Sequence, residues 1–257
     1  MRDVRMTLRT AFKDHHELEE SFIPPHHARV TRPSAVLFDI GDTLLREVRF
    51  DLEAGIRAAL PDPLLARAAG LAHSFREEVR EAHAVHRELM LSRWLRNHVA
   101  ELREVEMDRV EDAIWSEVVT LRPTHGIGAL LRRLHADGVR LGAISNAYFS
   151  GRVLRHELDR HGLADALDLV LSSGDLGIRK PDVRIFCEAL EQLGVPAECT
   201  WYVGDTFEED IAGALTAGLV PIWLRAGSAN RHVALPVRHL QDWTAFVAMY
   251  EAASVDQ

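Results

Sequence analysis

Cysteine is almost absent from this sequence, and so is any long apolar segment. Cys187 and Cys199 are its two cysteines, too few and too loosely placed for a disulfide framework or a zinc site. We expect both to be buried and reduced, as in a cytoplasmic protein. The sequence contains no run of about 18 or more apolar residues, the length needed to span a membrane. The N-terminus lacks the apolar segment of a signal peptide. We therefore expect neither membrane insertion nor secretion.

Positive charge is scarce, and lysine is scarcer still. The 30 basic residues are outnumbered by 39 acidic ones, and the net charge of −9 argues against nucleic acid as the main partner. Lys13 and Lys180 are the only lysines, so arginine supplies nearly all positive charge. A lysine deep in such a chain indicates a position where a compact ammonium fits between two anions and a planar guanidinium does not. Lys180 is therefore a candidate functional residue.

The remaining composition is that of a soluble globular protein. Its 47% apolar and 27% charged residues suit a sizeable core. The length of 257 residues allows one large domain or two modest ones, because domains commonly contain about 100–200 residues.

The stretch S-A-V-L-F-D-I-G-D-T-L-L at 34–45 organises the chain. Its apolar run 35–38 ends at Asp39, and the following Gly41-Asp42-Thr43 breaks the strand pattern. A short apolar run bounded by a turn predicts a buried strand of a parallel sheet, and catalytic groups gather at the carboxyl ends of such strands. Asp39 at that point can attack an electrophile, bind a metal or cap the turn.

The segments on either side differ in pattern. Residues 1–33 are polar and without sustained periodicity, which indicates an N-terminal arm. Residues 46–122 have helical spacing throughout, which predicts an all-helical cap domain inserted after the first strand. Most of the cap arginines are expected to pair with glutamates on solvated faces, and one or two of them can face a cleft and hold an anionic substrate. These arginines include Arg76, Arg80, Arg87, Arg93 and Arg96.

From residue 123 onward, strand and helix patterns alternate. Strands are predicted at 139–144, 167–171, 200–203 and 219–224, the last being the final strand, with helices between them and a closing helix at 241–253. Such alternation predicts a parallel sheet with helices on both faces. The fold class is therefore α/β, with a doubly wound, Rossmann-like core formed by 34–45 and 123–257.

Three of the predicted strands end in polar side chains. Asp39 follows the first strand, Ser145 and Asn146 follow the next, and Asp205 follows a third. Because the carboxyl ends of parallel strands share one edge, these side chains are expected to lie close together. The two aspartates offer oxygen ligands for Mg²⁺, while Ser145 and the amides after it can bind a phosphoryl oxygen.

Two further residues complete this group. Asp210 lies near the start of the next helix, where it can bind the water shell of a metal or cap the helix. Lys180 precedes another helix and can neutralise charge beside Asp39.

The combination of motifs resembles the haloacid dehalogenase-like hydrolase superfamily, and within it the helical-cap subfamily. The segments that carry the resemblance are F-D-I-G-D-T-L (38–44), A-I-S-N (143–146), R-K-P-D (179–182) and V-G-D-T-F-E-E-D (203–210). Each is weak alone, but their order and spacing together are specific. In that family the helical cap closes over small substrates.

The resemblance implies a role for each matching residue. Asp39 is the implied nucleophile that forms an aspartyl-phosphate, Ser145 and Asn146 bind the transferring phosphoryl group, and Lys180 steadies both. Mg²⁺ is the implied cofactor. Its implied ligands are Asp39, the carbonyl of Gly41 and Asp205, with Asp210 in support.

One position departs from the family pattern. Phosphatases of this family usually carry a second aspartate two residues after the nucleophile, which protonates the leaving alcohol, and here that position is Gly41. General acid–base catalysis is worth roughly 10²–10⁴-fold, so its absence matters. Asp42 is one residue further on, and such a shift on a tight turn generally points a side chain elsewhere.

Three explanations of Gly41 remain open at this point. The enzyme can act on substrates with good leaving groups, or take its acid from the cap or the substrate. It can be a 2-haloacid dehalogenase, since halide needs no proton. It can also be a catalytically weakened binding or regulatory protein.

The acidic motif argues against the dehalogenase and favours phosphoryl transfer. Dehalogenases of this family need no Mg²⁺ and typically lose that motif, whereas Asp205 and Asp210 are present here. A lysine Schiff base from the cap is disfavoured because 46–122 contains no lysine. We therefore predict a Mg²⁺-dependent phosphatase acting on a small phosphorylated metabolite, with the identity of the substrate, the oligomeric state and the role of the arm left open.

Overall fold

A computed structural model of the protein describes residues 31–224 and 237–253. A six-stranded sheet forms the core, with strand order β5-β4-β1-β6-β7-β8 and every neighbouring pair parallel. Its strands are β1 (Ala35–Phe38), β4 (Arg140–Ser145), β5 (Leu169–Ser172), β6 (Thr200–Gly204), β7 (Val220–Leu224) and β8 (Arg238–Leu240). The predicted parallel sheet is confirmed.

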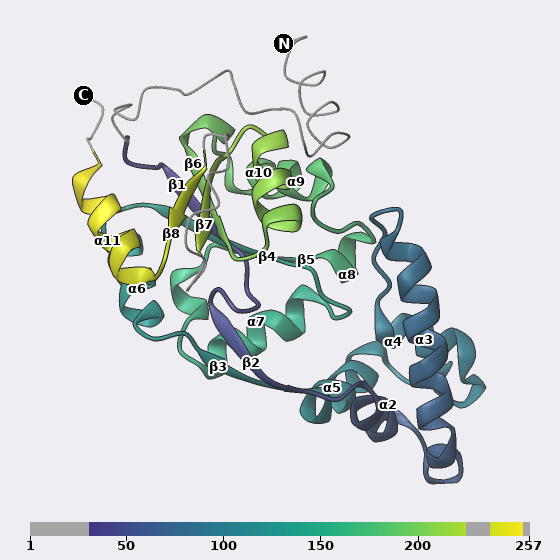
Figure 1. The fold of residues 1–257 in the computed structure, drawn as a ribbon. Coiled ribbons are helices and arrows are strands. Elements are labelled where there is room, and N and C mark those ends of the chain that lie inside the picture. Colours follow the sequence, from purple (N-terminus) through teal and green to yellow (C-terminus); the bar gives the residue numbers. More distant parts are fainter. Residues whose placement is uncertain (1–30, 225–236, 254–257) are drawn as a thin grey trace.

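Helices cover both faces of this sheet (Figure 1). Alternate side chains of β1 point to opposite faces, so Val36 and Phe38 join one apolar cluster while Leu37 joins the other. The first cluster packs against α6 (Ile127–Ala136), α7 (Gly151–Arg160) and α11 (Trp243–Ala252), and the second against α9 (Val183–Leu193) and α10 (Ala212–Thr216). Short elements complete the core, namely α8 (Ser173–Leu176), η3 (Ala164–Ala166) and η4 (Ala197–Cys199). This is the predicted doubly wound, Rossmann-like architecture.

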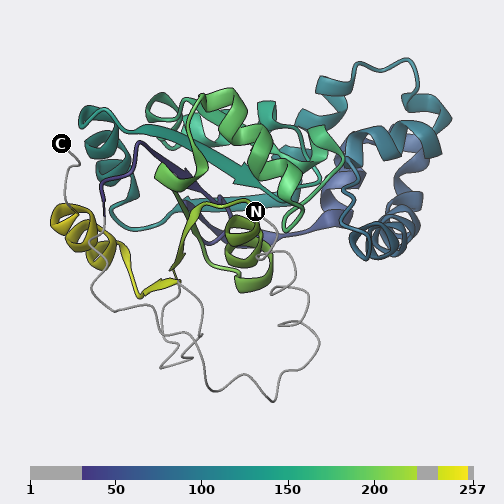
Figure 2. The ribbon, with the colours of Figure 1, turned by 90° about the horizontal axis from the view of Figure 1, so that it is seen from above.

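A helical cap lies between β1 and β4 in the chain and beside the core at one end (Figures 1 and 2). It contains α2 (Leu52–Ala59), η1 (Asp62–Arg67), α3 (Ala68–His83), α4 (Leu91–His98), η2 (Ala100–Leu102) and α5 (Met107–Val118). Gly55 lets α2 approach α5 closely, because a Cβ at this residue would lie 2.7 Å from the Cβ of Val118.

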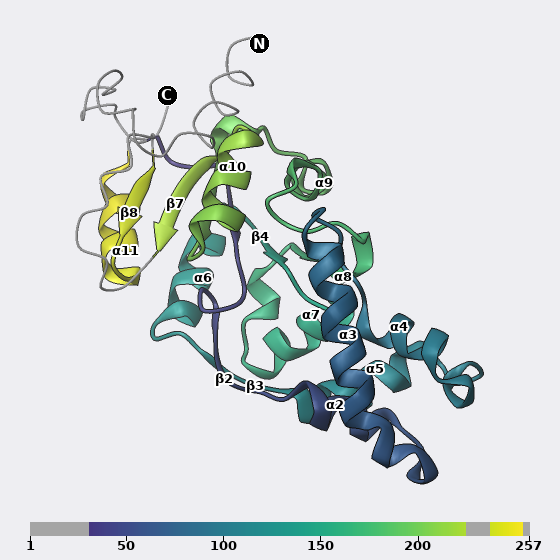
Figure 3. The same ribbon diagram turned by 45° about the vertical axis from the view of Figure 1, so that its right-hand side comes forward.

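The ends of the expected helical block are not helical. β2 (Leu45–Phe50) and β3 (Val119–Pro123) pair antiparallel and join the cap to the core (Figure 3). The prediction of helix throughout 46–122 was wrong at these ends because strand pairing joins Phe50 to Val119, far apart in the sequence, and all of β2 after Leu45 is exposed. The exact division of the chain into core and cap at residues 45 and 123 stays a prediction.

Three smaller expectations for the core need correction. The helix expected to start near Asp210 is preceded by a π-helical turn, η5 (Phe207–Ile211), and Asp210 lies inside this turn. A further strand, β8, follows the one expected to be final. Cys187 and Cys199 are exposed rather than buried. The inward face of α9 is taken by residues such as Phe186 and Ala189, and Cys199 ends η4, which has no buried residue.

Two other expectations concern the ends of the chain and the membrane. The predicted N-terminal arm lies almost wholly outside the described residues. Within the described ranges, no helix combines the length and apolarity needed to cross a membrane.

Candidate active site

Loops at the carboxyl edge of the sheet meet around one small cavity. Asp39 directly follows β1, and its amide donates to the carbonyl of Val203 at 2.8 Å. Ser145 ends β4, and Asp205 follows β6. The cavity has a volume of about 220 Å³, and its lining consists of Asp39, Gly41, Asp42, Ser145, Asn146, Asp205, Thr206, Glu209 and Asp210. The structure thus brings together predicted site residues from three of the four motifs.

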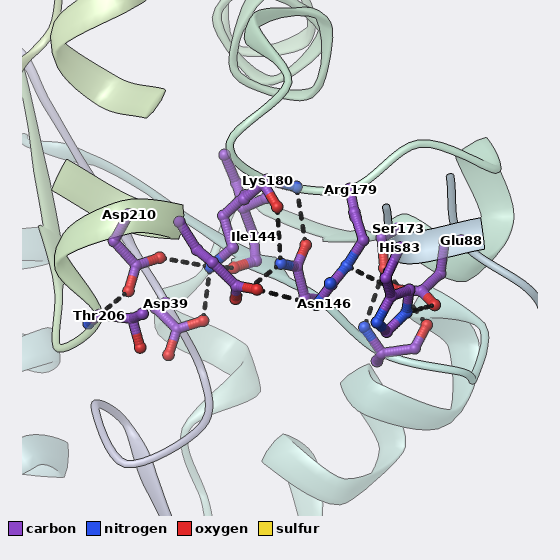
Figure 4. A network of polar contacts seen from close by, with 12 residues as sticks. Asp39, His83, Glu88, Ile144, Asn146, Ser173, Arg179, Lys180, Thr206 and Asp210 are labelled. Atoms are coloured by element: carbon purple, nitrogen blue, oxygen red, sulfur yellow. Dashed lines mark hydrogen bonds and ion pairs between the residues drawn. The ribbon is translucent and has the colours of Figure 1, made fainter. Parts of the chain in front are cut away.

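The fourth motif supplies Lys180, whose side chain is 1% exposed. Its Nζ donates to Oδ1 of Asp39 and to Oδ1 of Asp210, both at 2.6 Å, and to the carbonyl of Ile144 at 3.1 Å (Figure 4). The hydroxyl of Tyr202 lies 2.9 Å from Nζ and donates to Asp210 at 3.0 Å. The ammonium therefore lies between two carboxylates, in the kind of site that the rarity of lysine indicated.

Asp205 adds a third carboxylate to the cluster of Asp39 and Asp210, and the single ammonium of Lys180 does not balance their negative charge. Burial raises the pKa of Asp39 to about 7, with Asp210 adding to the rise and Lys180 opposing it. Burial also raises the pKa of Asp205 to about 6, and Asp210 contributes next. Burial alone would lower the pKa of Lys180, but Asp210 and Asp39 outweigh it and raise this pKa well above its usual range. Lys180 is therefore an ammonium at neutral pH.

The carboxylate of Asp210 is held from both sides. Its Oδ1 accepts from Lys180, and its Oδ2 accepts from the amide of Thr206 at 3.0 Å. The wider π-helical turn η5 contains this residue, and such turns often occur at functional sites. Gly204 makes room for it, because a Cβ at 204 would lie 2.4 Å from the Asp210 Cγ. Any larger residue at 204 would displace the carboxylate that holds Lys180.

These residues fit a hard divalent cation. One carboxylate oxygen from each of Asp39, Asp205 and Asp210 lies within 4.8 Å of the others, and Mg²⁺ prefers such oxygen ligands. Both oxygens of Asp210 already accept hydrogen bonds. We therefore expect Asp39, Asp205 and the carbonyl of Gly41 to hold the ion, with Asp210 orienting its neighbours.

The raised pKa values predict how Mg²⁺ will affect stability at different pH. A carboxyl group whose pKa is higher in the folded protein than its ordinary 3.8 stabilises the fold at low pH and loses that contribution as pH rises. For Asp205 and Asp39 the loss falls between about pH 4 and pH 7. Mg²⁺ binds the deprotonated groups. The rise in the melting temperature of the protein that Mg²⁺ causes should therefore be larger at about pH 8 than at about pH 5.

Differential scanning fluorimetry with and without Mg²⁺ measures this effect. Asp205→Asn should remove most of the increase at the higher pH, whereas Asp165→Asn, an exposed residue of η3, should retain it. An equal increase at both pH values would contradict the assignment of the cation to these carboxylates.

The Asn146 side chain is occupied by the protein itself. Its Oδ1 accepts from the amide of Lys180 at 2.8 Å, and its Nδ2 donates to the Lys180 carbonyl at 3.1 Å and to Glu209 at 2.9 Å. The side chain thus fixes the backbone that carries Lys180 (Figure 4). If Asn146 binds phosphate as predicted, it can do so only through its backbone amide.

A polar network links this site to the cap. Nη2 of Arg179 lies 3.0 Å from Oε1 of Glu209, and its Nε lies 3.4 Å from Oε2 of the buried Glu88. Glu88 also accepts from Ser173 at 2.9 Å and lies 2.9 Å from Nε2 of His83 (Figure 4). The sequence analysis assigned no role to these residues. Arg179 could have been noticed beside Lys180 in the R-K-P-D segment, but Glu88 lies in an ordinary helical pattern with no local signal.

A second cavity, of about 330 Å³, adjoins the first between core and cap. It shares Gly41, Ser145 and Asn146 with the smaller cavity. Its other lining residues are Ile40, Glu47, Phe50, Glu88, Trp115, Val119, Leu121, Ala147, Tyr148, Phe149, Leu154 and Arg179. A group attached to a phosphoryl group near Asp39 would extend into this space.

The cap arginines proposed to face a cleft do not do so. None of the five arginines named in the sequence analysis lines either cavity. Among the described residues, the one basic residue that lines these two cavities is Arg179, which belongs to the core. Arg80 instead pairs with Glu77 on an exposed face, and Arg96 donates to the carbonyl of Arg103. Arg80 thus follows the predicted pairing with glutamate on a solvated face.

The turn after the nucleophile places Asp42 away from the larger cavity, which argues against its replacing the missing acid. Asp42 has a left-handed φ of 51°, lines the smaller cavity only, and is one of the groups that raise the pKa of Asp205. It therefore lies on the metal side of the site. Gly41 lines both cavities, and a Cβ added there would have no atom within 4 Å.

Comparison with known proteins agrees with this geometry. Residues 33–218 match the family model of haloacid dehalogenase-like hydrolases. The glyceraldehyde 3-phosphate phosphatase of Methanopyrus kandleri is 31% identical over 209 residues, which cover 75% of this chain and 84% of that protein. The ribulose-1,5-bisphosphate 5-phosphatase of Halopiger xanaduensis is 32% identical over 206 residues, covering 72% of this chain and 82% of the relative.

A third relative matches over a shorter region. The pyrimidine 5'-nucleotidase YjjG of Escherichia coli is 36% identical over 129 residues, which span only 56% of its length and 49% of this chain. Among solved structures, the 2-haloacid dehalogenase of Pseudomonas syringae pv. Tomato has a TM-score of 0.57 at 25% identity, with 84% of this chain and 97% of that chain covered.

The chain belongs to the haloacid dehalogenase-like hydrolase family. The expected family and the expected class of enzyme, a hydrolase, are both confirmed.

Proposed function

We propose that the protein is a Mg²⁺-dependent phosphatase that hydrolyses a small phosphorylated metabolite through an aspartyl-phosphate on Asp39. The observation that carries this proposal is the contact of Lys180 with Asp39 inside a cluster of carboxylates suited to a divalent cation. The relatives named as phosphatases of glyceraldehyde 3-phosphate and ribulose bisphosphate support the reaction class.

Asp39, Lys180 and Ser145 have distinct roles in this reaction. Lys180 holds one carboxylate oxygen of Asp39, which leaves the other oxygen to attack phosphorus. The Ser145 hydroxyl lines both cavities and makes no hydrogen bond among the described residues, so it is available to donate to a phosphoryl oxygen. Bound Mg²⁺ would neutralise developing charge on the phosphoryl oxygens. Water then hydrolyses the acyl-phosphate and regenerates Asp39.

Dehalogenation of a 2-haloacid is the second candidate. The absence of an acid at Gly41 and the similarity to a 2-haloacid dehalogenase favour it. However, a 2-haloacid carries a carboxylate, and Arg179, the one cation lining the described cavities, is already paired with Glu209 and Glu88. The cluster of Asp39, Asp205 and Asp210 also suits a divalent cation, which dehalogenation does not need. The phosphatase proposal is therefore preferred.

Phosphate release from a panel of phosphate monoesters and acyl phosphates tests the proposal. We expect release with Mg²⁺, complete loss after chelation by EDTA, and recovery when Mg²⁺ is restored. Halide release from 2-chloropropionate by the chelated protein would establish the second candidate instead. Silence in both assays would favour a weakened family member that binds ligands without turning them over.

A further inference from the structure

The larger cavity has a mainly apolar wall. Phe50 of β2, Trp115 of α5 and Leu121 of β3 line it from the cap and its connecting strands. At about 30 Å³ for each water-sized atom, its 330 Å³ accommodates a group of about ten non-hydrogen atoms. Its contact with the smaller cavity at Ser145 and Gly41 makes it the place for a leaving group.

The charged residues of this cavity do not offer a free cation. Arg179 is the one basic lining residue, and its guanidinium is paired with Glu209 and the buried Glu88. Glu47 of β2 is an exposed lining residue whose side chain has no hydrogen bond or ion pair within the described parts of the chain. The unpaired charge that a leaving group would meet there is therefore negative.

We propose that this cavity selects phosphate monoesters whose leaving group is at least partly apolar and either uncharged or cationic, and that Glu47 disfavours leaving groups bearing a carboxylate or a second phosphate. The inference rests on the proposed function and names its substrate class. Like charges a few ångströms apart at a solvated site repel by an amount that corresponds to roughly tenfold in affinity or rate.

Three phenyl phosphates with a meta substituent provide the test. The substituents are a carboxamide, the isosteric carboxylate and a cationic aminomethyl group, and each leaving group matches the cavity in size. We expect kcat/KM for the carboxamide ester to exceed that for the carboxylate ester by about tenfold, with the aminomethyl ester at least as good as the carboxamide.

Glu47→Gln then isolates the cause. It should narrow the ratio of carboxamide to carboxylate ester several-fold, and because the same two esters are compared in both proteins, their intrinsic reactivities cancel. Glu117→Gln is the matched control, since Glu117 is an exposed cap glutamate that lines neither cavity, and the ratio should stay as in the wild type.

The outcomes separate this inference from the one on which it rests. Phosphate release with equal or greater kcat/KM for the carboxylate ester would overturn the substrate class while leaving the phosphatase intact. An unchanged ratio in Glu47→Gln would overturn the role of Glu47. Absence of phosphate release from all three esters, and from acyl phosphates as well, would overturn both proposals.

Discussion

Asp39→Asn is expected to reduce phosphate release by on the order of 10⁵–10⁶-fold, the size of loss found when the nucleophile of a covalent hydrolase is removed. An amide is not a nucleophile towards phosphorus, although its oxygen can still accept from Lys180. The variant should fold. Burial disfavours the ionised form of Asp39 and raises its pKa to about 7. At about pH 8 Asp39 is ionised despite this cost, so the metal-free variant should melt no lower than the metal-free wild type.

Steady-state phosphate release and thermal melting of both proteins measure these effects, with Asp165→Asn as an exposed control. Mass spectrometry of the wild type quenched during turnover should detect a phosphoryl adduct on the peptide that contains Asp39. Turnover within tenfold of the wild type would show that another group attacks the substrate.

Gly41→Asp is expected to raise the turnover of alkyl phosphates, within the roughly 10²–10⁴-fold that a general acid supplies. Gly41 lines both cavities, so a carboxyl group there can reach the leaving oxygen, and the open space around its Cβ position allows the larger residue. Esters with good leaving groups should gain less, because their departure does not need a proton.

Gly41→Asn is the matched control, since it has nearly the same shape but no proton of suitable pKa to give. Comparing an alkyl phosphate with 4-nitrophenyl phosphate in the two variants separates proton donation from a simple change in binding. If well-folded Gly41→Asp gains nothing over Gly41→Asn, protonation of the leaving group does not limit this enzyme.

The core and most of the site could be predicted because their signals are local. Apolar runs that end abruptly in a polar residue identified β1, β4 and β6, and parallel pairing then required Asp39, Ser145 and Asp205 to meet at one edge of the sheet. The rarity of lysine marked Lys180, which does lie between two carboxylates.

Where the chain pairs with itself over long distances, the local signals fail. The strand pair of β2 and β3 is an example, because β2 has no buried apolar face after Leu45 that a sequence pattern could mark. Tyr202 resembles any strand residue until the fold places its hydroxyl beside Lys180 and Asp210. The exposure of Cys187 depends on which face of α9 meets the sheet.

The amino-acid sequence by itself determined the sheet, its catalytic edge and the family, because strand ends and turns are set by neighbouring residues. Only the tertiary structure decided what surrounds a substrate. Arg179 is paired with Glu88 from the cap, and Glu47 and Trp115 face the same cavity, although these residues are far apart in the chain. Such contacts arise from the packing of the cap against the core, and no local sequence pattern predicts them.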